Sequence, residues 1–552
     1  MAEAGEAPWW HGAVVYQIYP RSFCLADPQG RRRRFARAGP TQPDPTRDGA
    51  GDLEGIRRHL DHIAGLGADA IWLSPIFTSP MADFGYDVAD YCDIDPLFGD
   101  LDDFDRLLND AHAHSLKVLL DWVPNHTSDQ HPWFLEARSS RSSPKRDWYV
   151  WRESVGADRE RPPNNWLRAF GSGPAWTFDT KTSQWYLHLF LPEQPDLNWA
   201  NPEVVTAMEG ILDFWLARGV DGFRIDVVHA LGKDPLLPDV TGDEAAVPYS
   251  ALNDHASTHE ILRRLRLHLD SWPSQPVSVG EVFLIKTSKI AEYYGNGDEL
   301  HLAFNFPAMF CPFDAGCFKR RLIEVEAFLT PRGAWPATVL SNHDRPRHRT
   351  RYGGSEQKAR AAAFYLLGTK GTAFLYAGEE LGLEDAPIPA RSAADPGGRD
   401  GCRALLPWDE TREHGWALEG APGWLPFAPE AAVVNAAAQA AEPRSMLSLY
   451  RRLISARRSS RALAHGSLEI LPGPEGFLAF RRLAGDDERI VAMSTAAEPL
   501  EWLPPTEAAT GNSGCSYLVE VASGGEGALA REGEIFGGRL GPGEAVILRP
   551  CG

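Results

Sequence analysis

Cysteine is scarce in this chain, and its cysteines do not have the spacing of a metal site. The seven cysteines form no C-x-x-C pair and no Cys/His ligand pattern; they stand at positions 24, 92, 311, 317, 402, 515 and 551. A scattered, odd-numbered set is typical of free thiols in a reducing compartment rather than of a disulfide scaffold or a zinc site. We therefore expect free cysteines and a cytoplasmic protein.

Long apolar runs and an excess of basic residues are also missing. No run of about 18 apolar residues is present, so a membrane-spanning helix is not expected. The acidic N-terminus lacks the apolar stretch of a signal peptide. The chain has 55 Lys and Arg against 75 Asp and Glu, a formal net charge of -20. This balance argues against nucleic acid and anionic membranes as partners and suits a neutral ligand or a cation. A monomer or a homodimer is expected.

Short apolar, strand-like runs alternate along the chain with longer amphipathic segments, such as Leu53–Leu66 and Leu101–His114. This alternation predicts βαβ units and a parallel sheet. Eight repeats favour a closed (β/α)8 barrel, a TIM barrel of the α/β class, over an open sheet. The predicted strands are Val14–Tyr19, Ala70–Leu73, Lys117–Asp121, Gly222–Val227, Val277–Glu281, Leu302–Phe306, Ala337–Leu340 and Thr372–Tyr376.

Two regions break this alternation. Residues 125–192 are rich in Trp, Ser, Pro and Arg without a helical repeat, which predicts an irregular subdomain inserted after the third strand. From about residue 466, short alternating runs with many Gly and Pro predict a C-terminal antiparallel β-sandwich; they include Phe477–Arg481, Arg489–Met493 and Ala545–Leu548. The predicted division is a barrel at 1–124 and 193–465, an insert at 125–192 and a C-terminal domain at 466–552.

The segment Gly222–His229 carries an arginine and an aspartate two residues apart inside an apolar run. Residues two apart in a strand point to the same face, so Arg224 and Asp226 are expected to lie side by side. A guanidinium beside a carboxylate keeps it ionised, as the nucleophile of a covalent glycosidase must be. From this segment alone, a structural ion pair at a strand end is an equally good interpretation.

Four other predicted strands also lead into polar residues, and the C-terminal ends of barrel strands meet on one rim. Asp226 and Glu281 fall on neighbouring strands, where a retaining glycosidase pair stands ~5–5.5 Å apart. The division expected is one carboxylate as nucleophile and the other as acid and base. His126 and His343 are neutral donors suited to sugar hydroxyls, with a loop or core hydrogen bond as the alternative for each. The polar segments are Gly85–Asp87, Asp121–His126, Gly280–Phe283 and Ser341–Asp344.

In order and spacing, these segments resemble glycoside hydrolase family 13, the α-amylase superfamily, over nearly the whole chain. The resemblance implies Asp226 as nucleophile, Glu281 as acid and base, and Asp344 as stabiliser of the transition state. It implies no cofactor for catalysis. It also implies a set of residues that bind the glucose at the cleavage site: Tyr86, Asp87, His126, Arg224, His343 and Arg347.

Three further segments look like the α-glucosidase and oligo-1,6-glucosidase branch: Val15–Phe23, Gln194–Trp199 and Gly378–Gly382. This resemblance implies a retaining, exo-acting α-glucosidase that releases glucose from the non-reducing end of short α-glucosides through a covalent glucosyl-enzyme. Val227 resembles the residue near the leaving sugar in α-1,6-active enzymes. Its neighbours 228–231 and residues 345–349 look more like α-1,4-active ones, so we expect α-1,4 to be favoured, with α-1,6 activity left open.

Other activities stay open from the sequence. Sugar and water compete for a glycosyl-enzyme, so transglucosylation is an expected side activity. A glucosyltransferase or isomerase of the same branch, of the trehalose synthase or sucrose isomerase type, is the main alternative. A non-catalytic sugar-binding or transporter-associated homologue is a remote one. Such homologues carry a membrane segment and have lost catalytic carboxylates, unlike this chain.

The loop after the first predicted strand partly resembles the family's loop for structural Ca²⁺ or Mg²⁺. The candidate ligands are Asp44, Asp48, Ala50 and Asp52. Alternating oxygen ligands of this kind suit hard cations. Thr46 is a poorer ligand than Asp or Asn, and the nearby run Arg31–Arg34 would oppose a cation, so bound and unbound forms both remain open.

Overall fold

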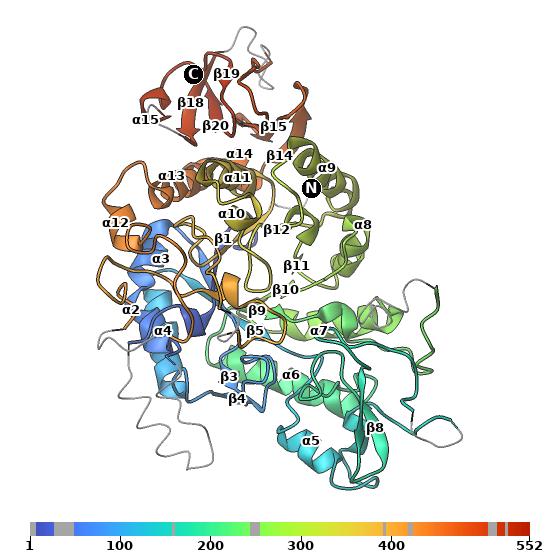
Figure 1. The fold of residues 1–552 in the computed structure, drawn as a ribbon. Helices are drawn as coiled ribbons and strands as arrows, with labels where there is room; N and C mark the ends of the chain where they lie inside the picture. The colour runs from blue at the N-terminus through green and yellow to red at the C-terminus, as the bar shows by residue number, and fades with distance from the viewer. Residues whose placement is uncertain are drawn as a thin grey trace.

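An eight-stranded parallel sheet forms the centre of the molecule in the computed structural model (Figure 1). The structure describes residues 7–26, 49–156, 161–242, 254–389, 393–417, 423–505, 516–524 and 528–551. The strand order is β11-β10-β9-β5-β2-β1-β13-β12, and a parallel bridge from Phe304 to Ala337 joins the two outer strands. The predicted TIM barrel is confirmed. Its strands are β1 Val14–Ile18, β2 Ala70–Leu73, β5 Lys117–Trp122, β9 Gly222–Ile225, β10 Val277–Gly280, β11 Leu302–Ala303, β12 Ala337–Val339 and β13 Thr372–Tyr376.

Alternate residues of the strands fill the inside and the outside of the barrel. Val15, Trp72 and Val279 belong to an interior cluster, whereas Tyr16 and Ile71 pack outward under the helices. This period of two follows from the pleat of a strand. The register pairs Arg224 of β9 with Val279 of β10, so Arg224 takes an inward position beside an interior residue.

Helices cover the outer face of the barrel and are fixed by side-chain caps. Asp52 accepts a hydrogen bond from the backbone N of Gly55, and Asp100 and Asp103 form a capping box. The longer helices are α4 Leu101–Ala113, α6 Pro202–Ala217, α7 Ala256–Asp270, α9 Ala315–Phe328, α11 Glu356–Gly368 and α13 Met446–Ser459. The shorter ones are α2 Leu53–Arg58, α3 Leu60–Leu66, α5 Pro132–Ala137, α8 Thr287–Ile290, α10 His348–Arg351, α12 Ala436–Ala440, α14 Arg461–His465 and α15 Ala528–Arg531.

The helix predicted over 53–66 is broken at His59. The ring of His59 stacks on Trp408, with centroids 3.6 Å apart, and its Nδ1 lies 2.8 Å from the carbonyl oxygen of Gly55. This packing comes from a residue far along the chain, so the local periodicity of the segment carried no sign of the break.

The inserted segment contains a small antiparallel sheet, which corrects the prediction that it is irregular. The sheet has the order β6-β8-β7 and stands beside α5 in the teal part of Figure 1. Its strands are β6 Trp151–Arg152, β7 Trp176–Asp179 and β8 Gln184–Leu187. Strands of two to four residues are too short to show an alternating pattern, and they are held by aromatic cross-strand pairs such as Trp151 with Tyr186.

The predicted C-terminal antiparallel sheet is confirmed. Its five strands have the order β14-β15-β16-β20-β18, and a two-stranded sheet of β17 and β19 packs on it through Leu500 and Leu540. The strands are β14 Ser467–Leu471, β15 Phe477–Ala484, β16 Asp487–Ser494, β17 Leu500–Glu501, β18 Tyr517–Ala522, β19 Arg539–Leu540 and β20 Ala545–Pro550. A further hairpin, β3 Phe77–Thr78 with β4 Asp90–Ile94, lies beside the barrel. The exact domain limits remain a prediction.

The expectation of free thiols throughout is wrong for one pair. Cys311 and Cys317 form a disulfide, with Cα atoms 5.8 Å apart. Between them the chain turns into α9, whose N-cap Asp314 accepts a hydrogen bond from the backbone N of Cys317. The turn brings two cysteines together that are six residues apart. Among the described residues, Cys24, Cys92, Cys402 and Cys551 are free thiols. None of the described helices combines the length and apolar character that crossing a bilayer requires.

Candidate active site

A cavity of about 320 Å³ opens where the strands of the barrel end. Its lining comes from several segments that are distant in the sequence, as the predicted convergence of strand ends requires. Six of the residues singled out in the sequence lie in this lining: Tyr86, His126, Asp226, Val227, Glu281 and Asp344. The size matches that of a site for a small molecule.

Arg224 stands beneath this cavity and binds three carboxyl groups. Its Nη1 donates to Asp121 Oδ1 and to Asp226 Oδ1, each at 2.7 Å, and its Nη2 donates to Glu281 Oε2 at 2.7 Å. The register of β5, β9 and β10 brings these side chains to one level of the barrel. The backbone N of Val227 donates a second hydrogen bond to Glu281 Oε2 at 3.1 Å. One guanidinium therefore fixes the positions of both predicted catalytic carboxyls.

Arg224 lowers the pKa of Asp226, as predicted, but it is not the largest influence on that pKa. Burial raises the pKa of Asp226 well above its ordinary value; Arg224 lowers it, but Glu281 and Asp121 raise it further. Burial also raises the pKa of Asp121 to about 6. One guanidinium therefore serves three buried carboxyl groups, and its effect on the pKa of Asp226 is smaller than that of burial.

Asp344 has the opposite environment. Burial alone would raise the pKa of Asp344, but His343, Arg399 and Arg403 outweigh it and hold that pKa well below its usual range. Arg399 Nη1 lies 3.1 Å and Arg403 Nη2 3.4 Å from Asp344 Oδ1. Burial lowers the pKa of His343 to about 3, so at neutral pH the two arginines carry the stabilisation. Asp344 is therefore stabilised as an anion.

A buried aspartate holds these two arginines in place. Asp395 Oδ1 accepts from Arg399 Nη2 at 2.6 Å and from Arg403 Nη1 at 3.2 Å. Arg403 Nε also donates to the carbonyl oxygen of His343 at 2.9 Å. Asp395 thus sets the geometry of Asp344 indirectly, through Arg399 and Arg403.

Both predicted histidines are neutral groups, but only His126 lines the cavity; His343 is buried outside the lining, where its ring stacks on Tyr86. His343 Nε2 is 2.6 Å from the hydroxyl of Tyr86, and its Nδ1 is 2.7 Å from Gln17 Nε2. His126 Nε2 is 3.1 Å from Gln194 Nε2. Burial lowers the pKa of His126 to about 4. Neutral rings of this kind suit hydrogen bonds to hydroxyl groups without adding charge.

The structure corrects two predicted sugar contacts. Asp87 is fully buried outside the cavity lining and accepts hydrogen bonds from Ser79 Oγ and from the backbone N atoms of Ala82 and Asp83. It therefore holds the loop that carries the cavity residues. Arg347 donates from Nη1 to the carbonyl oxygen of Ala377 at 2.9 Å and also lies outside the lining.

Asp83 and Arg399 line the cavity, and the sequence reasoning missed both. Arg399 Nη2 donates to Asp83 Oδ1 at 2.5 Å, so the two form an ion pair at the cavity wall. The sequence did offer one sign that Asp83 reaches the cavity, because it stands only three residues before Tyr86 in the same turn. Arg399 follows a Pro-Gly-Gly turn beyond the last barrel strand, where no predicted strand or helix could place it.

The predicted metal loop is only partly described. Asp44 and Asp48 lie outside the described residues. Ala50 is fully buried, and Asp52 Oδ1 accepts hydrogen bonds from Gly55 N at 2.7 Å and Ala26 N at 3.2 Å. One oxygen of Asp52 is therefore used in capping α2. Metal binding at this loop stays a prediction.

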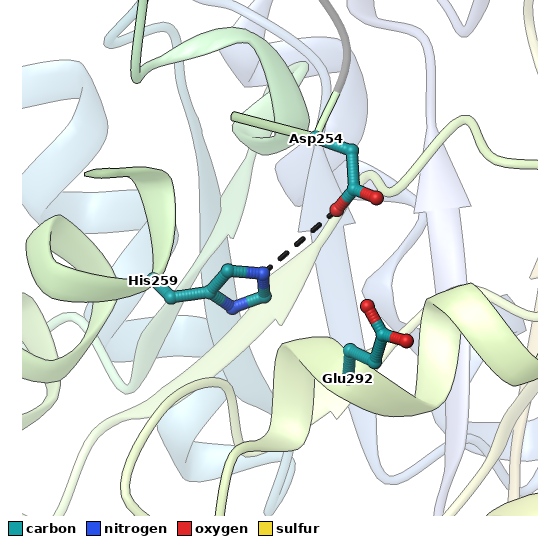
Figure 2. Close-up of side chains that lie close together, drawn as sticks. All are labelled: Asp254, His259 and Glu292. Carbon is teal, nitrogen blue, oxygen red and sulfur yellow. Dashed lines mark ion pairs between the residues drawn. The ribbon is translucent and has the colours of Figure 1, made fainter. Parts of the chain in front are cut away.

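Among the described residues, one histidine–carboxylate group has the spacing of a metal site: Asp254, His259 and Glu292 (Figure 2). A lysine already supplies the positive charge there. Lys289 Nζ lies 3.0 Å from Asp254 Oδ2 and 2.9 Å from Glu292 Oε2. The group is therefore better explained as an ion-pair network than as a metal centre.

His259 in this network is expected to make stability depend on pH. Asp254, 3.8 Å from Nε2, and Glu299, 2.7 Å from Nδ1, raise the pKa of His259 to about 9. The folded state therefore holds the proton more tightly, and this stabilisation is complete below pH 6.5 and lost as pH rises through 9. Allowing for partial exposure of the ring, the loss is about 1–2 kcal/mol.

The measurement is the free energy of unfolding in urea between pH 6 and pH 9.5. His259→Gln should remove the part of the fall in unfolding free energy that comes from loss of the His259 proton. Arg412→Gln, at a side chain that is 95% exposed, should reproduce the wild-type curve. A constant difference between wild type and His259→Gln at every pH would show that the linkage is absent.

Comparison with known proteins gives consistent matches over almost the whole chain. The sequence model of the family described as "Alpha amylase, catalytic domain" matches residues 17–466. A Rhizobium meliloti (strain 1021) protein named "Probable alpha-glucosidase" is 39% identical over 542 residues, which cover 90% of this chain and 92% of that protein. An Escherichia coli (strain K12) protein named "Trehalose-6-phosphate hydrolase" is 33% identical over 537 residues, which cover 90% of this chain and 92% of that protein.

Solved structures agree with the fold. The crystal structure of an alpha-glucosyl transfer enzyme, XgtA, is 36% identical, with a TM-score of 0.84 and 99% of this chain and 100% of that chain covered. The trehalulose synthase MutB from Pseudomonas mesoacidophila MX-45 is 29% identical, with a TM-score of 0.86 and the same shares covered.

Proposed function

The chain belongs to the α-amylase family, and from this premise we propose that it is a retaining, exo-acting α-glucosidase. Its substrates are short α-glucosides, from which it releases glucose at the non-reducing end. The observation that carries the proposal is the binding of Asp226 and Glu281 by one guanidinium, that of Arg224, at the wall of the cavity. The relatives named as glucosidases support the same reaction class.

In the proposed first step, Asp226 attacks the anomeric carbon while Glu281 protonates the leaving oxygen. This step needs one carboxyl as an acid and the other as an anion, and the hydrogen bonds from Arg224 hold both in position. In the second step, Glu281 takes a proton from water, which then displaces the sugar from Asp226. Arg224 neutralises the carboxylate that is freed in each half of the cycle.

The other cavity residues are assigned by their charge and position. Asp344, held as an anion by Arg399 and Arg403, stabilises the positive charge that develops on the sugar ring in an oxocarbenium-like transition state. His126 binds a sugar hydroxyl and Tyr86 contacts the sugar, while His343 positions Tyr86 through the hydrogen bond to its hydroxyl. Asp83 and Arg399 form the charged wall that binds the terminal glucose, replacing Asp87 and Arg347 in this role.

Val227 is the proposed contact to the leaving sugar. It lines the cavity directly after the nucleophile and has a positive φ of 35°, which is strained for a β-branched residue. This backbone places the Val227 amide on Glu281. One apolar contact is worth only about 1–3 kcal/mol of discrimination, so we propose preference for α-1,4 links with α-1,6 activity retained.

A rate comparison tests the activity. We expect kcat/KM to be highest for maltose, lower for isomaltose and maltotetraose, and lowest for sucrose and trehalose, with glucose as the main product. The purified wild-type protein is compared with Asp226→Asn, which controls for contaminating glucosidases. Formation of a rearranged disaccharide from sucrose or maltose in excess of glucose would contradict simple hydrolysis.

Glucosyl transfer is the second candidate, and the leaving-group side of the cavity favours it as a side activity. Phe283, Phe306 and Met309 line that side, and Arg345 lies 5.3 Å from the centroids of the Phe283 and Phe310 rings. An apolar, aromatic wall with a guanidinium binds an acceptor sugar well. Transfer should therefore increase with substrate concentration, whereas hydrolysis dominates at low concentration.

A further inference from the structure

A second cavity, of about 570 Å³, shares no lining residue with the catalytic cavity. It lies between the inserted segment, at 141–152, and the chain that follows β9, at 233–237. Its volume is within the range of sites for small molecules. None of the residues assigned to the proposed reaction faces it, so whatever it binds is independent of that reaction.

Four basic side chains line this cavity, and two of them have their charges paired. Arg141 Nη1 lies 2.8 Å from Glu153 Oε1, and Lys233 Nζ lies 3.1 Å from the buried Asp196 Oδ2. These pairs are complete without a ligand. The remaining two, Arg146 and Arg152, are different.

Arg146 and Arg152 have no carboxylate within 4.0 Å among the described residues. The Nη atoms of Arg146 donate to Ala137 O, Thr182 Oγ1 and Gln184 Oε1. Those of Arg152 donate to the carbonyl oxygens of Trp151 and Pro235. Every acceptor is neutral. These bonds fix where the two guanidinium groups stand without a close ion pair. Asp179 and Glu153 act on Arg146 only from farther away, and its guanidinium lies 3.4 Å from the centroid of the Trp151 ring.

Partial burial adds to the cost of these two charges. It lowers the pKa of Arg146 to about 10 and also lowers the pKa of Arg152. Guanidinium groups that are oriented, partly buried and without a close ion pair favour an anion with several acceptor oxygens. Two carboxylates face the same space. Asp234 Oδ1 accepts from the backbone N of Leu236, and the charge of Asp147 acts on Arg152 without a close ion pair.

We propose that this cavity binds a phosphate group through Arg146 and Arg152. Planar guanidinium groups match the geometry of phosphate oxygens, and two of them can bind one phosphate from different sides. The phosphate belongs either to free inorganic phosphate or to a small phosphorylated sugar. The overall charge of -20 makes such a site selective, because the rest of the surface repels anions.

The test is isothermal titration of the full chain with inorganic phosphate at constant ionic strength. We expect one binding site per chain, at least tenfold weaker binding in Arg152→Gln and partial retention in Arg152→Lys. Arg152 bonds only two carbonyls, so its replacement should leave the fold intact, as circular dichroism can check. Arg412→Gln is the matched control at an exposed arginine and should bind as wild type does.

A parallel titration with glucose 6-phosphate identifies the source of the phosphate. Tighter binding than that of inorganic phosphate, lost in Arg152→Gln, assigns a sugar phosphate; equal binding assigns free phosphate. The proposal is overturned if wild type binds neither ligand at tens of millimolar. It is also overturned if Arg152→Gln binds both as tightly as wild type. Neither result bears on glucosidase activity, so failure here is distinguishable from failure of the proposed reaction.

Discussion

Replacement of Asp226 by asparagine is expected to lower kcat on maltose on the order of 10⁴-fold or more, with the fold unchanged. An amide cannot form the glucosyl ester, and it keeps the size and the hydrogen bond to Arg224 Nη1 that positions the carboxyl. The loss should therefore be in kcat and not in stability. Steady-state rates and melting temperature together measure this.

The matched variant is Glu281→Gln, and the choice of substrate separates the two roles. An aryl α-glucoside with an acidic phenol as leaving group needs little protonation in the first step. Glu281→Gln should therefore release the phenol rapidly in a burst and then turn over slowly, because deglucosylation needs a base. Asp226→Asn should show no burst on any substrate. A burst in Asp226→Asn, or equal losses for both variants on both substrates, would contradict the assignment.

Replacement of Arg224 by methionine is expected to have the largest effect on stability. The side chain is 2% exposed and serves as the cation for Asp121, Asp226 and Glu281. Removing one partner of a buried ion pair costs about 3–5 kcal/mol, since the remaining charge stays buried without compensation. Here three carboxyls lose the same partner, so we expect a loss at the upper end of that range and very low activity.

The control is Arg218→Met, in a pair with Asp105 at the surface. The side chains of that pair are 26% and 43% exposed, and such pairs are worth only about 0–1 kcal/mol. Urea unfolding of both variants measures the contrast. The Arg224 variant should also recover stability at low pH relative to wild type, because its carboxyls then bind protons. Equal destabilisation by both changes would refute the central role of Arg224.

The barrel could be predicted because each of its strands is recognisable from its own residues. Segments such as Val277–Glu281 and Thr372–Tyr376 are apolar runs of strand length between helical patterns, and β10 and β13 appear within those bounds. The convergence of Asp226, Glu281 and Asp344 followed from topology, because all lie just beyond strand ends that must share one rim.

What the sequence could not reveal depends on contacts between distant segments. Arg399 reaches the cavity from the N-cap of a short 3-10 helix, Asp400–Arg403, beyond the last barrel strand. The break at His59 depends on Trp408. The pKa of Asp226 could not be read from Arg224 alone. Asp121 and Glu281 share that guanidinium, and burial outweighs it. The disulfide could be predicted only by knowing that the chain turns at Asp314.

The most direct test of the central claim is to trap the glucosyl-enzyme and locate it by peptide mass spectrometry. A fluorinated glucosyl fluoride slows the steps that pass through the oxocarbenium-like transition state, while fluoride leaves readily. With Glu281→Gln, which also slows deglucosylation, we expect the fluoroglucosyl group on the peptide that contains Asp226. An adduct on another residue, or no adduct together with β-glucose as the first product from maltose, would contradict a retaining mechanism with Asp226 as nucleophile.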